Sequence, residues 1–230
     1  PGDHDNSIPV ENLSIDCGFN YETIEKYVRV GDFISFVQKP VLLNDGQAVT
    51  GKALDNRVSV SLLAFTAAAM KTNGHLSEIL YIASLQEEVG LRGAVTAAYG
   101  LSPDYAIAID VTHGALSGLD SRKTFPLGKG PAVAVGPNFH PGMSDLLQAA
   151  GQESKLSFQI EPIPARSGTD AWALQVSGEG IPTALLSIPL RYMHSVVELV
   201  NRNDLIAAGK LLVAALNKIE VLSGEEIIRC

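Results

Sequence analysis

AVTGKALDNRVSVSLLAFTAAAMK, residues 48–71, is the stretch that decides the fold class of this chain. Its first residues, Ala48 to Lys52, form a short β-rich run. From Asn56 to Lys71 the apolar side chains instead recur at spacings of three and four, which is typical of a helix with one buried face. The stretch therefore predicts a strand followed directly by an amphipathic helix, with Asp55 at the junction.

The same alternation of short apolar runs and helical stretches continues to the C-terminus. Helices are expected in the gaps between strands, most clearly from Asp204 to Ile219. The pattern predicts an α/β fold, with a mainly parallel sheet flanked by helices. The further candidate strands are Ile79 to Leu85, Tyr105 to Ile109, Ala132 to Val135, Phe158 to Pro162 and Thr183 to Ile188.

Residues 1–47 lack this alternation. They hold two short β-like pieces, Leu13 to Ile15 and Phe33 to Val37. Turn signals occur at Gly18, at Gly31 to Asp32 and at Asn44 to Gly46. We assign residues 1–47 to a separate small β region and residues 48–230 to the main domain.

Composition narrows the class of protein. The chain has 230 residues, of which 46% are hydrophobic and 18% charged, as in ordinary soluble domains. Its formal charge of -8 and the lack of a Lys or Arg cluster argue against a nucleic-acid partner. No apolar run approaches the ~20 residues that span a bilayer. Cys17 and Cys230 fit neither a disulfide framework nor a thiolate site, so we expect a cytoplasmic protein.

Ionisable residues follow several of the expected strands. Ligands of open α/β sheets bind beyond the carboxyl ends of the strands, so parallel strands would gather these side chains at one edge. Carboxylates and an imidazole, without a thiolate, form a donor set suited to zinc, cobalt or manganese. The residues are Asp55, Glu87, Glu88, Asp110 and His194.

Each of these residues also has an ordinary structural reading. Asp55 suits a helix cap, Glu87 and Glu88 a solvated acidic pair, and Asp110 a turn. A lone His194 is more often a satisfied polar residue than a ligand. Their joint placement after successive strands is what favours a site.

The other histidines and motifs carry less weight. His113 and His140 lie in loops that contain Gly or Pro, and they are reserve ligands. His75 and His4 are expected to lie outside any site. The chain has no Gly-x-Ser-x-Gly elbow and no phosphate-binding glycine loop, which argues against a serine hydrolase and a nucleotide enzyme.

Five motifs in order resemble a known family: KALDNR (52–57), QEEVG (86–90), AIDV (108–111), GTDA (168–171) and RYMHS (191–195). Over nearly its whole length the chain is similar to dinuclear-metal aminopeptidases of the tetrahedral TET, glutamyl-aminopeptidase and deblocking type. Some relatives carry endoglucanase or cellulase names. The resemblance implies a zinc-exopeptidase-like fold, and homo-oligomers from dimers to dodecamers. Leu13 to Gly18 and Val30 to Phe36 look like part of the family's small inserted β-barrel.

Carried over by position, the resemblance implies two divalent metal ions. Asp55 would bridge both ions, Glu88 and His194 would complete one site, and Asp110 would serve the other. Glu87 would then be the general base for a metal-activated water. We expect Glu87 and Glu88 to point apart, as neighbours in an extended chain do.

The activity implied is a metal-dependent aminopeptidase that hydrolyses N-terminal residues from peptides with a free N-terminus. Asp170 and Arg191 are candidates for lining the substrate pocket or for holding His194 in place. An endoglucanase is the weaker alternative, because Glu87 and Glu88 are neighbours and cannot flank a sugar linkage.

One family feature is missing from the chain. In the family, a His-x-Asp motif before the barrel supplies a histidine ligand, and His4-Asp5-Asn6 does not match it by its surroundings. We therefore expect a catalytic domain that lacks its N-terminal strands. It would hold one ion at Asp55, Glu88 and His194 but bind the Asp110 ion poorly. A catalytically impaired metal-binding or assembly remnant is the alternative from another functional class.

Overall fold

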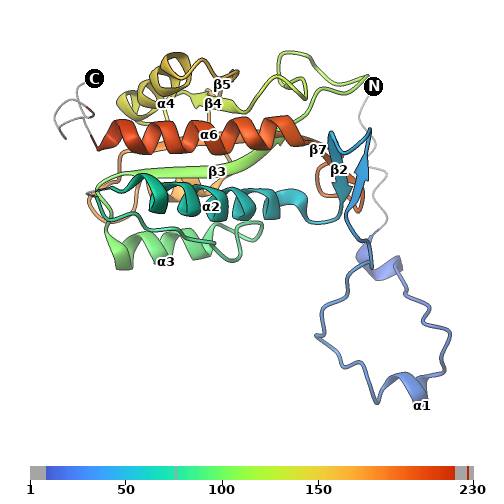
Figure 1. Cartoon of the computed structure of the whole chain (residues 1–230). Coiled ribbons are helices and arrows are strands. Elements are labelled where there is room, and N and C mark those ends of the chain that lie inside the picture. The colour runs from blue at the N-terminus through green and yellow to red at the C-terminus, as the bar shows by residue number, and fades with distance from the viewer. Residues whose placement is uncertain (1–8, 76, 221–226, 228–230) are drawn as a thin grey trace, which may run out of the picture. The chain divides into compact units, whose positions relative to one another are not determined.

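The computed structural model describes residues 9–75, 77–220 and 227 (Figure 1). Contacts divide the chain into two compact units, Pro1–Val37 and Gln38–Cys230. This division falls earlier than the boundary predicted at residue 47. The reason is that β1 (Val41–Leu43) pairs with β2 (Ala48–Gly51) as part of the main sheet.

The described part of the first unit, residues 9–37, holds two short helical elements, η1 (Val10–Asn12) and α1 (Tyr21–Ile24). The side chain of Asn20 caps α1 by accepting a hydrogen bond from the Thr23 N–H. The strands predicted within this unit are wrong, because their backbone finds no ladder partner among the described residues. Phe33 is fully exposed. The predicted partial β-barrel is therefore not confirmed.

The second unit is built on a seven-stranded sheet in the order β1-β2-β7-β6-β4-β5, with β3 also paired to β6. Pairs β3–β6 and β4–β5 are parallel, and the other four pairs are antiparallel. The sheet is mixed, so the prediction of a mainly parallel sheet is not confirmed. Short turns join β1 to β2 and β6 to β7, and such connections require antiparallel neighbours. The remaining bounds are β3 (Ala106–His113), β4 (Ala132–Val135), β5 (Gln159–Pro162), β6 (Thr183–Arg191) and β7 (Glu198–Asn201).

Most predicted strands of the main domain are confirmed, and β4 has the predicted bounds. β3 and β6 run further toward the C-terminus than predicted. Ile79 to Leu85 is not a strand, and this prediction was wrong. Among the described residues its backbone pairs with no strand, and Leu80 and Leu85 stay 42% and 76% exposed. β propensity alone does not make a strand without a partner.

Helices cover both faces of the sheet. α2 (Leu54–Asn73), α4 (Pro141–Glu153) and α6 (Arg202–Ile219) pack against one face, and α2 and α6 lie side by side (Figure 1). Val133, Leu186 and Leu211 are fully buried in this layer. Neighbouring strand residues such as Leu185 point to the opposite face, where α5 (Asp170–Leu174) packs and contacts α3 (Arg92–Leu101).

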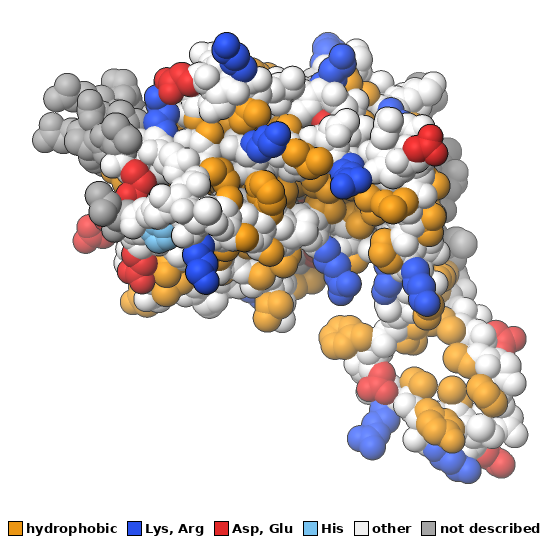
Figure 2. All heavy atoms as spheres, in the orientation of Figure 1, with side chains coloured by type: hydrophobic (Ala, Val, Ile, Leu, Met, Phe, Trp, Pro, Cys, Tyr) orange, Lys and Arg blue, Asp and Glu red, His pale blue; other side chains and the backbone are white. Residues whose placement is uncertain are grey.

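The surface seen in Figure 2 carries Lys and Arg side chains that are spread over it, with apolar and acidic side chains between them. Among the residues that the structure describes, no helix is both long and apolar enough to cross a membrane. The cytoplasmic location and the lack of a nucleic-acid partner stay predictions.

Candidate active site

Asp55 lies at the junction between β2 and α2. Ala53 turns the chain with a φ of 55°, and Asp55 and Asn56 have non-helical dihedral angles, so regular helix begins after them. The peptide bond between Asp55 and Asn56 is cis. The Asp55 carboxylate faces His194, so its contact is with the candidate site.

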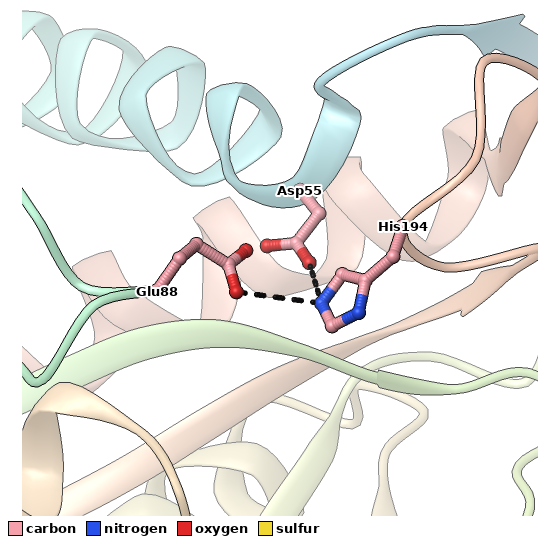
Figure 3. Close-up of side chains that lie close together, drawn as sticks. All are labelled: Asp55, Glu88 and His194. Atoms are coloured by element: carbon pink, nitrogen blue, oxygen red, sulfur yellow. Dashed lines mark ion pairs between the residues drawn. The ribbon is translucent and has the colours of Figure 1, made fainter. Parts of the chain in front are cut away.

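Three side chains converge on one point in Figure 3. The Nε2 of His194 lies 3.3 Å from an oxygen of Asp55 and 3.5 Å from an oxygen of Glu88. One potential ligand atom of each residue lies within 4.8 Å of the other two. Ligands of a tetrahedral zinc ion at ~2.0–2.2 Å are about 3.3–3.5 Å apart. The two separations from His194 match this spacing, and the third lies within 4.8 Å, so the three side chains form a candidate site for one divalent cation.

Glu198 fixes two of these three residues, although sequence reasoning did not single it out. It begins β7 and is only 2% exposed. One of its oxygens accepts a hydrogen bond from the Asp55 backbone N–H, and the other accepts from the His194 backbone N–H, both at 3.0 Å. The available signal was an acidic residue four positions after His194, at the start of an apolar strand.

Glu87 begins a turn. Its carbonyl oxygen accepts hydrogen bonds from the N–H groups of Gly90 and Leu91, so the expected extended chain at this point is wrong. The Glu87 side chain is half-buried and lies outside the three-residue cluster. Burial, together with the nearby carboxylates of Glu88 and Asp170, raises its pKa to about 7.

Asp110 sits inside β3, because the strand continues to His113 instead of ending before the aspartate. It is buried, and its Oδ1 accepts hydrogen bonds from the Asn56 side chain at 3.0 Å and from the Val111 N–H at 2.8 Å. Burial raises its pKa to about 8, against the effect of the Val111 hydrogen bond.

The pKa of Asp55 is also raised. Burial raises its pKa to about 6, and the carboxylates of Glu88 and Glu198 act in the same direction. The cavity that these groups line has no Lys or Arg among its described lining residues. A divalent cation is the kind of charge that would relieve such repulsion.

A single cavity of about 230 Å³ brings the predicted residues together. Of the reserve ligands, His113 lines it and His140 does not; His75 lies outside it, bonded to the Ser77 carbonyl. His4 lies outside the described residues. The predicted residues that line the cavity are Asp55, Glu87, Glu88, Asp110 and His194.

Asp170 and Arg191 do not line this cavity. Asp170 begins α5 and accepts a hydrogen bond of 2.5 Å from the hydroxyl of Ser84. Arg191 ends β6, and its Nε donates to the Ala115 carbonyl at 2.6 Å. Asp170 thereby contacts the segment that leads to Glu87, and Arg191 contacts the loop after β3.

Known proteins resemble this chain in sequence and fold. It is 37% identical over 221 residues to the lysyl aminopeptidase of Pyrococcus furiosus, covering 95% of this chain and 63% of that protein. An aminopeptidase structure from the archaeon Desulfurococcus kamchatkensis aligns with a TM-score of 0.80 and 35% identity, over 90% of this chain and 58% of the other. The TET1 peptidase of Pyrococcus horikoshii, which can assemble into a tetrahedron or a large octahedral shell, aligns with a TM-score of 0.71 and 29% identity, over 84% and 57%.

The chain therefore spans less than two thirds of the length of these relatives. The family described as M42 glutamyl aminopeptidase matches residues 1–211. With nearly the whole chain inside this match and the site residues gathered in one cavity, the chain belongs to the M42 glutamyl aminopeptidase family.

Proposed function

We propose that the protein is a metal-dependent aminopeptidase that removes residues from the free N-terminus of peptides. The observation that carries this proposal is one cavity that combines a three-residue cation cluster with a half-buried glutamate outside it. A purely structural metal site has no use for such a free carboxylate. The family match supports the same activity.

Asp55, Glu88 and His194 would hold the proposed first ion, and Asp110 would serve a second. Zinc, cobalt and manganese all suit oxygen and imidazole ligands. A bound divalent cation supplies Lewis-acid polarisation of the scissile carbonyl and lowers the pKa of water. Glu198 orients Asp55 and His194 by holding their backbone N–H groups.

Glu87 is the proposed general base. A base works best when its pKa lies near the operating pH, and burial brings Glu87 to about 7. It would take the proton of the attacking water and deliver it to the leaving amine. Asp170 acts on Glu87 electrostatically and through the Ser84 contact, so we assign it a positioning role. Arg191 would hold the loop after β3 through Ala115.

We also propose that the protein forms homo-oligomers and that residues 1–47 take part in the contact between subunits. Support comes from the shell-forming TET1 relative and from apolar side chains that the described first unit leaves exposed. Tyr27, Val30 and Phe33 are among them, exposed by 78%, 109% and 104%. Size measurement by light scattering would test this assembly.

The test of the activity is hydrolysis of a panel of aminoacyl chromogenic substrates, with and without added cobalt or zinc. Glu87→Gln removes the base and leaves the cation cluster intact, so it should abolish turnover but retain metal binding. Glu179→Gln, an exposed glutamate far along the chain, serves as the matched control. No turnover in any metal would leave the metal-binding remnant as the better account.

A further inference from the structure

Glu161 is a buried carboxylate that the proposed reaction does not use. It lies on β5, is 8% exposed, and lines the same cavity as the cation cluster. Its Oε1 accepts a hydrogen bond of 2.5 Å from the Thr112 hydroxyl. Its Oε2 is buried and has no hydrogen-bond partner of ordinary geometry within the described residues, although the Ser187 hydroxyl is near enough to favour the ionised form.

The charge around Glu161 is unbalanced. Asp55 raises the pKa of Glu87, and both raise the pKa of Asp110, whereas Glu161 is not among the groups that act on Asp55, Glu87 or Asp110. Glu161 is also not a member of the cation cluster formed by Asp55, Glu88 and His194. Burial raises the pKa of Glu161, and among the described residues the one titratable side chain that acts on it is the exposed His113.

Such an arrangement suits a cationic ligand. A buried carboxylate without a partner is costly unless a positive charge or a proton joins it. No described Lys or Arg side chain lines the cavity, so the chain itself does not provide that charge there. Ile163, Leu185 and Met193 give the cavity apolar wall, which can cover the methylene stem of a long basic side chain.

We propose that Glu161 is the specificity residue of a subsite that binds the cationic side chain of an N-terminal lysine or arginine of the substrate. This inference rests on the proposed aminopeptidase function and names the class of residue removed. It does not depend on the relatives' names, which differ between lysyl and glutamyl.

The kinetic test uses the full-length protein and compares kcat/KM for lysyl and norleucyl p-nitroanilides. Norleucine keeps an unbranched aliphatic chain but lacks the ammonium group. Wild type should favour lysine, and Glu161→Gln should reduce the lysine-to-norleucine ratio about 10- to 100-fold, the range for a hydrogen bond to a charged group. Glu179→Gln should leave the ratio unchanged.

A binding measurement separates this inference from the proposed function. Calorimetry measures the binding of L-lysinamide and L-norleucinamide to the protein. It does not require turnover, and the comparison of the two amides can be made with the wild-type protein alone. If wild type binds lysinamide more tightly than norleucinamide, and Glu161→Gln abolishes this preference, the subsite is supported even if no substrate is hydrolysed. Equal binding of the two amides by wild type, or an unchanged preference in a folded Glu161→Gln protein, would overturn it. Turnover without any preference for lysine would contradict the proposed subsite but not the proposed aminopeptidase activity.

Discussion

At the scale of single residues, Glu198 shows how the site is held. Both of its oxygens accept backbone N–H groups, one from Asp55 and one from His194. These two residues belong to segments far apart in the sequence, so a single buried carboxylate sets their separation. Residues of this kind behind metal ligands are often as necessary as the ligands themselves.

Glu198→Gln should weaken zinc binding roughly 10- to 100-fold. The amide would turn its NH₂ toward one of the two N–H donors, so one hydrogen bond is lost and a donor is left unpaired. Competition titration with a chromogenic chelator measures the affinity, and circular dichroism checks the fold. Unchanged affinity in a folded variant would show that Glu198 does not position the ligands.

The raised pKa values of Asp55, Glu87 and Asp110 predict how pH affects the metal-free protein. The folded state binds protons more tightly than the unfolded chain at these groups, whose ordinary pKa values are 3.8 to 4.5 and whose raised values are about 6 to 8. Stability should therefore fall as pH rises from about 4 through about 8.

Divalent cations should reverse this trend at pH 8, because they compete with protons for the same oxygens. Thermal melting with and without zinc across this pH range is the measurement. A metal-free melting temperature that rises steadily up to pH 8 would contradict the assignment of these groups.

At the scale of elements, much of the second unit could be predicted from periodicity. The long helices α2 and α6 could be predicted because their apolar side chains recur at helical spacing, and β4 because it is a short continuous apolar run. Which strands pair with one another could not be predicted from the sequence. Ile79 to Leu85 has the composition of a strand but no partner among the described residues, and β3 continues past Asp110 because β6 pairs with it up to His113.

The close packing of α3 against the segment before the Glu87 turn can be tested at Gly93. A Cβ on Gly93 would lie 2.4 Å from the backbone N and O of Leu85, which cannot move without shifting the turn that follows. Gly93→Ala should therefore displace Glu87 and Glu88 and lower kcat at least tenfold. Such losses are known for small displacements of catalytic groups.

Gly100→Ala is the matched control in the same helix, because nothing lies within 4 Å of its Cβ position. It should keep full activity and stabilise the protein by up to about 1 kcal/mol, since alanine favours helix more than glycine does. Equal kinetics for the two variants would mean that Gly93 does not set the turn.

At the scale of the whole molecule, the gathering of the site residues did not require the sheet to be parallel throughout. Asp55 follows β2, which pairs antiparallel with β7, and Asp110 lies in β3, which pairs parallel with β6, yet both line the same cavity. Asp55 and His194 could be predicted because each follows the end of a strand, whereas Glu88 and Asp110 were selected on strand ends that the structure does not have. Glu198 and Glu161 were not predicted, because each reads as a strand residue, and their contacts with Asp55 and Thr112 join segments distant in sequence.

Anomalous diffraction from zinc-soaked crystals would show whether Asp55, Glu88 and His194 hold a metal ion. We expect a strong peak bound by all three side chains, with a weaker one or none at Asp110. Two fully occupied ions would contradict the prediction for Asp110. Zinc bound elsewhere, with no peak among Asp55, Glu88 and His194, would contradict the proposed cation site itself.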